Sequence, residues 1–233
     1  MEKGFFLGIE TSSEVTGIAI VKEVTILYEL RCLTGSKHNE TIFSLLSDAL
    51  KFIGVTIKDL SGIGVAIGPG MFTSLRVGLA LAKGLALPYR LPVKGINTLD
   101  ALAGTFPKSR MGIVIPIIDA RKGEVFTAFY QNGERTSDYL ILSPEKLAQV
   151  ITQNYPNESI TLIGNGLRSY LNLLTTLLPQ GFDPILLEAP LPSIIALKAR
   201  ESIIQGEFSD VATLQPFYLR PTDAELKRQK ATV

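Results

Sequence analysis

Five residues could bind a phosphate-bearing ligand: an acid at the end of an apolar run, two hydroxyl residues beside it, and two glycines further along the chain. Glu10 could hold a hydrated Mg²⁺ ion, because this cation is bound through carboxylates. Thr11 and Ser12 follow it directly. Gly68 and Gly70 allow a sharp turn before a helix, whose first N–H groups can receive an anion. These residues are candidates for a weak anion or nucleotide contact.

A second acidic turn contains Asp119, Arg121 and Glu124. It lacks the adjacent glycines that let backbone amides close on a phosphate, which argues against nucleotide hydrolysis. The three charges can form ion pairs within the turn or contact a partner protein, and both interpretations stay open. A stand-alone ATPase or small-molecule kinase is the alternative function that this pattern leaves.

Metal and nucleophile chemistry is limited by the residue inventory. The chain has one histidine, His38, with Thr34 four residues before it and Ile42 four residues after. A His-x-x-x-His pair of zinc or iron ligands therefore cannot form. No Gly-x-Ser-x-Gly elbow occurs, although a Ser–His pair using His38 stays open. We expect no metal site, no catalytic residue and no resident cofactor.

Composition indicates a folded protein without a strong attraction for nucleic acid. The 233 residues are 46% hydrophobic, and the net charge is +1. A dedicated tRNA binder usually shows a basic stripe, which this sequence lacks. The single cysteine fits a reducing compartment. Without a signal-peptide pattern or an apolar run long enough to cross a bilayer, we expect a cytoplasmic location and no membrane contact.

The elements that must position these residues repeat once along the chain. Apolar patterning predicts an α/β protein with a junction near residue 108, which gives an N-terminal lobe of residues 1–108 and a C-terminal lobe of residues 109–233. The tail after residue 219 could return to the first lobe. The expected strands are residues 5–9, 16–21, 25–31, 63–67, 93–96, 113–118, 125–130, 139–142, 160–163 and 185–187. The expected helices are residues 39–53, 73–87, 98–106, 144–154, 167–178 and 193–205.

Both halves share the order strand, acid, turn, strand, strand, helix, strand, glycine break, helix. Glu10 corresponds to Asp119, and Gly68-Pro69-Gly70 corresponds to Gly164-Asn165-Gly166. A duplicated βββαβα unit is how actin, sugar kinases and Hsp70-type chaperones are built. We therefore expect two actin-like lobes, a fold that does not by itself imply a function.

The helix expected at residues 73–87 is rich in small residues. Gly78 and Ala82 lie one turn apart, and a glycine inside a helix costs about 1 kcal/mol relative to alanine. Close approach of another helix from a partner would offset this cost, whereas packing inside the same lobe is the alternative. Arg76 lies near the start of this helix, where we expect a carboxylate to hold it, either Glu10 or an acid of a partner.

Several motifs resemble those of the TsaB (YeaZ) family. Residues 67–86 resemble its Gly-Pro-Gly-Ser-Phe-Thr-Gly-Leu-Arg signature, with Met71 and Ser74 as departures. The other motifs are Leu7-Gly8-Ile9-Glu10-Thr11-Ser12, Ser36-Lys37-His38-Asn39-Glu40, Asp119-Ala120-Arg121-Lys122-Gly123-Glu124-Val125-Phe126 and Pro216-Phe217-Tyr218-Leu219-Arg220. Together they extend over nearly the whole chain.

The resemblance implies a non-catalytic subunit in the synthesis of threonylcarbamoyladenosine beside the tRNA anticodon. It implies pairing with a TsaD-type catalytic subunit, a TsaE-type ATPase in the assembly, tRNA bound through the complex, and a homodimer when alone. A glycoprotease-like peptidase is the other alternative, because the wider family has carried that name. The pairing surface would be the helices at residues 39–53 and 73–87, through Ile42, Leu45, Leu46, Ala49, Leu75, Gly78, Leu79, Ala82 and Leu85.

Overall fold

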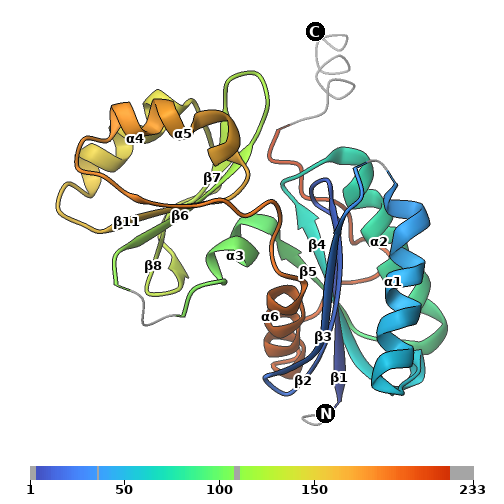
Figure 1. The fold of residues 1–233 in the computed structure, drawn as a ribbon. Helices are drawn as coiled ribbons and strands as arrows, with labels where there is room; N and C mark the ends of the chain where they lie inside the picture. The colour runs from blue at the N-terminus through green and yellow to red at the C-terminus, as the bar shows by residue number, and fades with distance from the viewer. Residues whose placement is uncertain (1–3, 36, 108–110, 221–233) are drawn as a thin grey trace, which may run out of the picture.

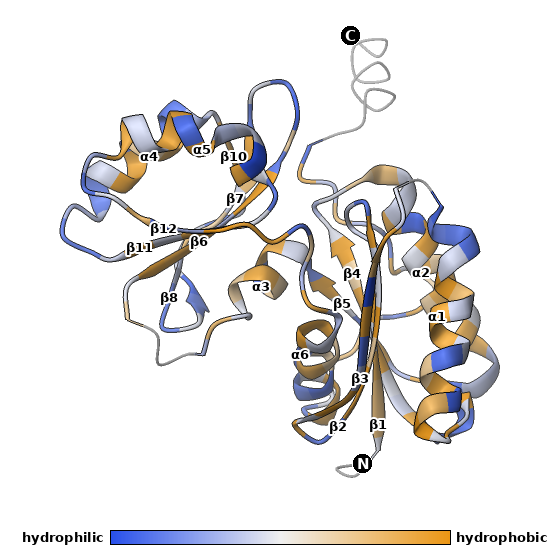
Figure 2. Cartoon of the chain, in the orientation of Figure 1, coloured by the Kyte–Doolittle hydropathy of each residue, from blue (hydrophilic) through white to orange (hydrophobic). Residues whose placement is uncertain are grey.

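Two α/β lobes lie side by side in the computed structural model, which describes residues 4–35, 37–107 and 111–220 (Figure 1). The first lobe contains a five-stranded sheet and the second a sheet of seven strands. Apolar residues line the central strands and the helices that cover them (Figure 2). None of the helices in these ranges is long and apolar enough to span a bilayer.

The elements of the first half follow the expected order. They are β1 (Phe5–Glu10), β2 (Val15–Lys22), β3 (Thr25–Leu33), α1 (His38–Ile53), a short 3-10 turn (Ile57–Asp59), β4 (Leu60–Gly68), α2 (Phe72–Tyr89), β5 (Val93–Asn97) and α3 (Thr98–Ala103). Gly54 ends α1 with a left-handed backbone conformation at φ 76°, which a residue without a side chain adopts at little cost.

The second half repeats this order with shorter strands. Its elements are β6 (Ile113–Asp119), β7 (Val125–Thr127), β8 (Tyr130–Gln131), β9 (Glu134–Arg135), β10 (Leu140–Leu142), α4 (Pro144–Asn154), β11 (Ile160–Ile163), α5 (Gly166–Leu177), β12 (Asp183–Ile185) and α6 (Pro192–Ile204). The single strand expected at residues 125–130 is divided into β7 and β8. The β8–β9 hairpin was not expected, although Asn132 and Gly133 at its turn, both with positive φ, are a typical hairpin signal.

The two sheets confirm the duplicated α/β fold. Strand order is β3-β2-β1-β4-β5 in the first lobe and β10-β7-β6-β11-β12 in the second. In each, the first three strands of the repeat pair antiparallel, and the next two add in parallel. β1 therefore corresponds to β6, and Glu10 and Asp119 end equivalent central strands.

Helices are exchanged between the lobes. α1 and α2 cover one face of the first sheet, and α6 packs on its other face through Ile195, Ala196 and Ala199 (Figure 1). α3 follows the last strand of the first sheet but packs on the second, where Leu99 and Leu102 join its core. The assignment of all residues after 108 to the second lobe is therefore wrong for α6. The chain returns to the first sheet at Pro192, where α6 covers most of the apolar face opposite α1 and α2, next to Ala101 of α3.

Candidate functional site

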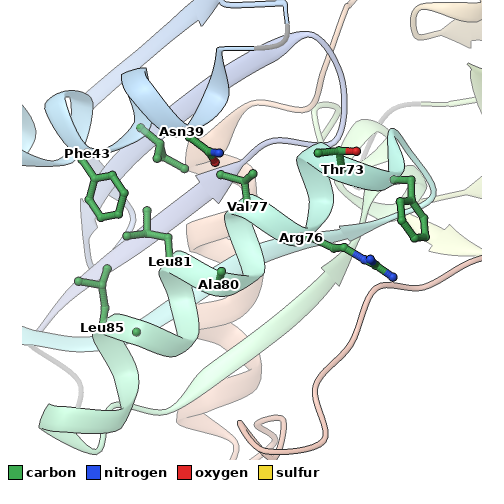
Figure 3. A pocket seen from close by; sticks show the side chains of 11 residues that line it. Asn39, Phe43, Thr73, Arg76, Val77, Ala80, Leu81 and Leu85 are labelled. Carbon is green, nitrogen blue, oxygen red and sulfur yellow. The ribbon is translucent and has the colours of Figure 1, made fainter.

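An apolar groove of about 600 Å³ lies between α1 and α2 on the outer face of the first lobe (Figure 3). Phe43 and Phe72 remain 62% and 41% exposed there. The lining comprises Asn39, Ile42, Phe43, Phe72, Thr73, Arg76, Val77, Ala80, Leu81, Gly84 and Leu85. Exposed aromatic and aliphatic side chains gathered in one hollow are typical of a protein–protein contact surface.

Most of the side chains expected to form a partner surface face the other way. Leu85 lines the groove and is partly exposed, and Ile42 lies at the groove's base with its side chain buried. The other seven, which are Leu45, Leu46, Ala49, Leu75, Gly78, Leu79 and Ala82, are buried inside the lobe. They form the helix stripes that pack toward the sheet, and a side chain enclosed by its own lobe cannot contact a partner. These seven side chains are therefore not available to a partner, whereas the groove exposes the outer side of α2 and the neighbouring edge of α1.

The small residues of α2 that lie beside open space are Ala80 and Gly84, and not the predicted Gly78 and Ala82. A β-carbon at Gly78 would lie 2.4 Å from the hydroxyl oxygen of Thr11, so this glycine accommodates β1 rather than another protein. Ala80 and Gly84 are exposed, lie one turn apart and line the groove. Apart from the adjacent backbone of α2, no atom of the described residues lies within 4 Å of a β-carbon built at Gly84. This pair leaves room for a partner helix.

Aromatic rings, not a carboxylate, hold Arg76. Its guanidinium carbon lies 3.8 Å from the centre of the Phe72 ring, and its Nε donates a hydrogen bond to the Tyr218 hydroxyl at 3.2 Å. Glu10, the expected partner, is fully buried and bonds to Ser12 instead. The expectation of an intramolecular carboxylate is therefore wrong for the described residues.

A second hollow, of about 520 Å³, separates the lobes. Ser12 and Gly70 line it, whereas Glu10, Thr11 and Gly68 do not. The Oε1 atom of Glu10 accepts hydrogen bonds from the backbone N–H of Ser12 at 2.5 Å and from its hydroxyl at 2.6 Å. Burial raises the pKa of Glu10 to about 7, against these hydrogen bonds, which lower it. The carboxyl is thus enclosed in the first lobe and not presented to the cleft.

The two glycines expected to receive an anion are instead used for packing. A β-carbon at Gly70 would stand 2.3 Å from the carbonyl oxygen of Ser12, and one at Gly68 would stand 2.7 Å from that of Phe217. Two backbone hydrogen bonds, Met71 N–H to Ser12 and Phe217 N–H to Ile67, close these contacts at 2.8 and 2.7 Å. Neighbouring chain segments therefore cover Gly68, whereas Gly70 packs on Ser12 and still lines the hollow.

The second acidic turn is ion-paired. A carboxylate oxygen of Asp119 lies 3.6 Å from a guanidinium nitrogen of Arg121. The backbone N–H of Arg121 also donates a hydrogen bond to the Asp119 carboxylate at 2.8 Å. Glu124 pairs with Arg220, and the same guanidinium donates to the carbonyl of Ala120 at 2.9 Å. Asp119 and Arg121 line the cleft, together with Arg168 and Glu188, which pair with each other at 2.6 Å.

His38 is a structural residue at the start of α1. Its Nδ1 shares a hydrogen bond with the Thr16 hydroxyl at 2.7 Å, and the side chain is buried. Burial lowers the pKa of His38, so the ring is neutral at neutral pH. Within the described ranges, no three His, Cys, Asp or Glu side chains are close enough together to hold a metal ion.

Comparisons with known proteins decide the family. A family model described as "TsaD: tRNA N6-adenosine threonylcarbamoyltransferase" matches residues 32–170. The tRNA threonylcarbamoyladenosine biosynthesis protein TsaB of Bacillus subtilis is 30% identical over 228 residues, which cover 95% of this chain and 96% of that protein. The chain belongs to the TsaB family. The Escherichia coli TsaB is 32% identical over 72% of this chain and 74% of its own.

A solved structure agrees with this assignment. YeaZ from Pseudomonas aeruginosa superposes with a TM-score of 0.75 at 26% identity, over 93% of this chain and all of that one. The resemblance to the TsaB (YeaZ) family predicted from sequence motifs is thereby confirmed, and so is the fold class.

For this TsaB family member, sequence reasoning missed most of the groove: Asn39, Phe43, Phe72, Thr73, Val77, Ala80, Leu81 and Gly84. A signal for them was present. α2 carries more apolar residues than a single buried stripe needs. The four-residue spacing of Arg76, Ala80 and Gly84 places them on a second face of the helix, where Ala80 and Gly84 are small residues. Apolar residues on two sides of a helix indicate two contacts, one with the sheet and one outside the lobe.

Proposed function

We propose that the protein is a non-catalytic scaffold subunit in the synthesis of threonylcarbamoyladenosine in tRNA. It binds a TsaD-type catalytic subunit through the groove between α1 and α2 and organises that subunit for the transfer of threonylcarbamoyl to the N6 atom of the adenosine beside the anticodon. The names of its relatives supply the pathway. The uncovered apolar groove is the basis for the proposed contact with the catalytic subunit.

The groove supports this proposal because nothing in the described part of the chain fills it. Phe43 and Phe72 keep large apolar areas in water, at roughly 25 cal/mol for each Å² that a partner could cover. Ala80 and Gly84 in its lining are small and let another helix come close to the α2 backbone. A self-associated pair would cover the same area, which is why we infer a homodimer for the protein alone.

The rest of the assembly follows from the same proposal. A TsaE-type ATPase joins the pair, tRNA is bound through the complex, and the reaction takes place in the cytoplasm, where tRNA is modified. Asp119 is paired with Arg121, and Glu10 is buried in the first lobe. Both observations argue against nucleotide hydrolysis by this chain alone.

Reconstitution tests the function. The chain is mixed with the TsaD-type and TsaE-type proteins of the same organism, a threonylcarbamoyl-adenylate donor and tRNA, and each component is omitted in turn. Digested tRNA is analysed by mass spectrometry for the modified nucleoside. We expect product only when this chain and the catalytic subunit are both present. Phosphate release from ATP and Mg²⁺ by the chain alone would favour the ATPase alternative instead.

A groove variant links this activity to the surface. Gly84→Leu places a branched side chain where, apart from the adjacent α2 backbone, no described atom lies within 4 Å of the β-carbon, so we expect the fold to be retained. We expect affinity for the catalytic subunit to fall at least about tenfold. Asn172→Leu, an exposed helix position of α5 in the other lobe, is the matched control. Equal affinity of the Gly84→Leu variant and the control would refute the groove as the contact.

A further inference from the structure

Arg76 is a cation fixed in place without a carboxylate. Its Nε donates to Tyr218, and its guanidinium lies against Phe72. No Asp or Glu among the described residues lies within 4.0 Å of its nitrogens, whereas Arg121, Arg168 and Arg220 each have one. The guanidinium has five N–H donors. Four of them, on its two terminal nitrogens, make no hydrogen bond within the described part of the chain.

The aromatic support of Arg76 comes from a distant part of the chain. The rings of Phe72 and Tyr218 stack with centroids 5.1 Å apart and 22° between their planes. Tyr218 belongs to residues 216–220, a segment fastened to β4 by the Phe217–Ile67 hydrogen bond. Arg220 fastens the other end to the second lobe. Because two rings already order Arg76, it loses little side-chain entropy when it binds a ligand.

Arg76 also has a defined position relative to the groove. Arg76, Ala80 and Gly84 are four residues apart in turn, so they follow one another along a single face of α2. Figure 3 shows Arg76 extending from the side of α2 away from Phe43, beside the groove that both residues line. A helix packed over Ala80 and Gly84 would place a side chain of its next turn beside this guanidinium.

We propose that Arg76 binds an Asp or Glu side chain on the helix that the catalytic subunit places in the groove, and that Tyr218 positions Arg76 for this contact. The inference rests on the proposed function and adds the chemistry of the partner: an apolar helix face with small central contacts and one carboxylate near its end. A planar guanidinium binds a carboxylate through two parallel hydrogen bonds, which fixes the register of the helix as well as its affinity.

The binding experiment uses the full chain and the TsaD-type subunit of the same organism, with affinity measured by calorimetry at low and high salt. We expect Arg76→Ala to weaken binding about tenfold or more, and Arg76→Glu to weaken it further because it opposes two negative charges. The loss should shrink at high salt, which screens charges. Lys146→Glu, an exposed site on α4 in the other lobe, is the control for the same change of charge.

A charge reversal identifies the acid. Each Asp or Glu on the partner's contacting helices is changed to Arg in turn, and one of these changes should restore binding to the Arg76→Glu variant. Tyr218→Phe keeps the ring but removes the hydroxyl that Arg76 contacts. It should weaken binding a few-fold in the native background and have no effect in the Arg76→Ala background, a coupling that a purely structural role would not show.

The outcomes separate this inference from the proposed function. If Gly84→Leu abolishes pairing while Arg76→Ala stays within twofold of the native affinity, the carboxylate contact is wrong and the groove is right. If Gly84→Leu also binds normally, the proposed function itself fails. If Arg76→Ala leaves protein pairing unchanged but lowers the affinity of the complex for tRNA, Arg76 binds a phosphate and the inference is overturned.

Discussion

Gly8 on β1 and Pro192 at the start of α6 are packed so closely that a β-carbon at Gly8 would lie 2.0 Å from the Pro192 carbonyl oxygen. This contact joins β1 to α6, the first strand to the last helix of the described residues. Gly64 on β4 makes an equivalent approach to the Ile195 carbonyl at 2.6 Å. Both glycines therefore set the depth at which α6 lies on the first sheet.

Gly8→Ala should destabilise the protein, because backbone on both sides of the contact must move to admit the methyl group. Overpacking of this kind costs about 1–3 kcal/mol, which urea unfolding would measure. Gly84→Ala is the control: its β-carbon meets nothing, and alanine in place of a helix glycine should stabilise by about 0.5–1 kcal/mol. A Gly8→Ala protein as stable as the native one would show that α6 is not seated as described.

Arg220→Ala should loosen residues 216–220 from the second lobe. The change removes a hydrogen bond to the Ala120 carbonyl and the pairing with Glu124, both partly buried, at a cost of about 1.5–3 kcal/mol in unfolding free energy. Arg168→Ala breaks an ion pair with Glu188 that is exposed to solvent, and it should cost clearly less than Arg220→Ala. Equal losses for the two variants would contradict a specific role for Arg220.

Glu10 should make stability depend on pH in the direction opposite to most carboxylates. Burial raises its pKa from 4.5 to about 7, so the folded protein favours the neutral acid. The stabilisation is complete below pH 4.5 and is lost as pH rises to about 7, an effect of about 3 kcal/mol. Glu10→Gln stays neutral and should be the more stable protein at pH 8, with little difference at pH 4.5.

Urea unfolding of both proteins from pH 4.5 to 8 checks this. Glu201→Gln removes the same charge from an exposed helix position and is the control. A constant difference between native protein and Glu10→Gln across this range would mean that Glu10 is ionised in the folded state.

Asp100→Ala should weaken the attachment of α3 to the second lobe. The carboxylate accepts hydrogen bonds from Tyr130 at 2.5 Å and Tyr139 at 2.7 Å, and its proximity raises the pKa of both phenols beyond the effect of their burial. Removing it leaves the buried Tyr130 hydroxyl and the half-buried Tyr139 hydroxyl without this acceptor, and we expect a loss of about 2–4 kcal/mol in unfolding experiments. Tyr139→Phe, which removes one donor and keeps the ring, should cost less than half as much.

The sequence predicts the repeat well and the exchange of helices poorly. Apolar runs followed by Glu10 and Asp119 locate the central strand of each sheet, because strand periodicity and turn residues are local signals. Which sheet α6 covers is not a local property. Gly8 and Gly64 inside strands were the available sign, since glycine at such positions marks the close approach of another backbone.

The residues predicted to contact a partner lie on the two helices that border the groove, but most of them face the interior of the lobe. In α2 the apolar residues extend around most of the helix, so spacing alone does not separate the side toward the sheet from the side toward a partner. Gly78 and Gly84 look alike in sequence. Only the position of Thr11 against Gly78, and the open space beside Gly84, tell them apart.

The exchanged helix α6 also imposes an order on biosynthesis. Phe6, Val21 and Ala66 form the face of the first sheet that residues 192–204 cover. While the ribosome is still making the second lobe, that face has no cover and remains available to chaperones or to other nascent chains. The first lobe to be translated is thus among the last parts of the molecule to complete its core, and folding of the two lobes cannot proceed strictly one after the other.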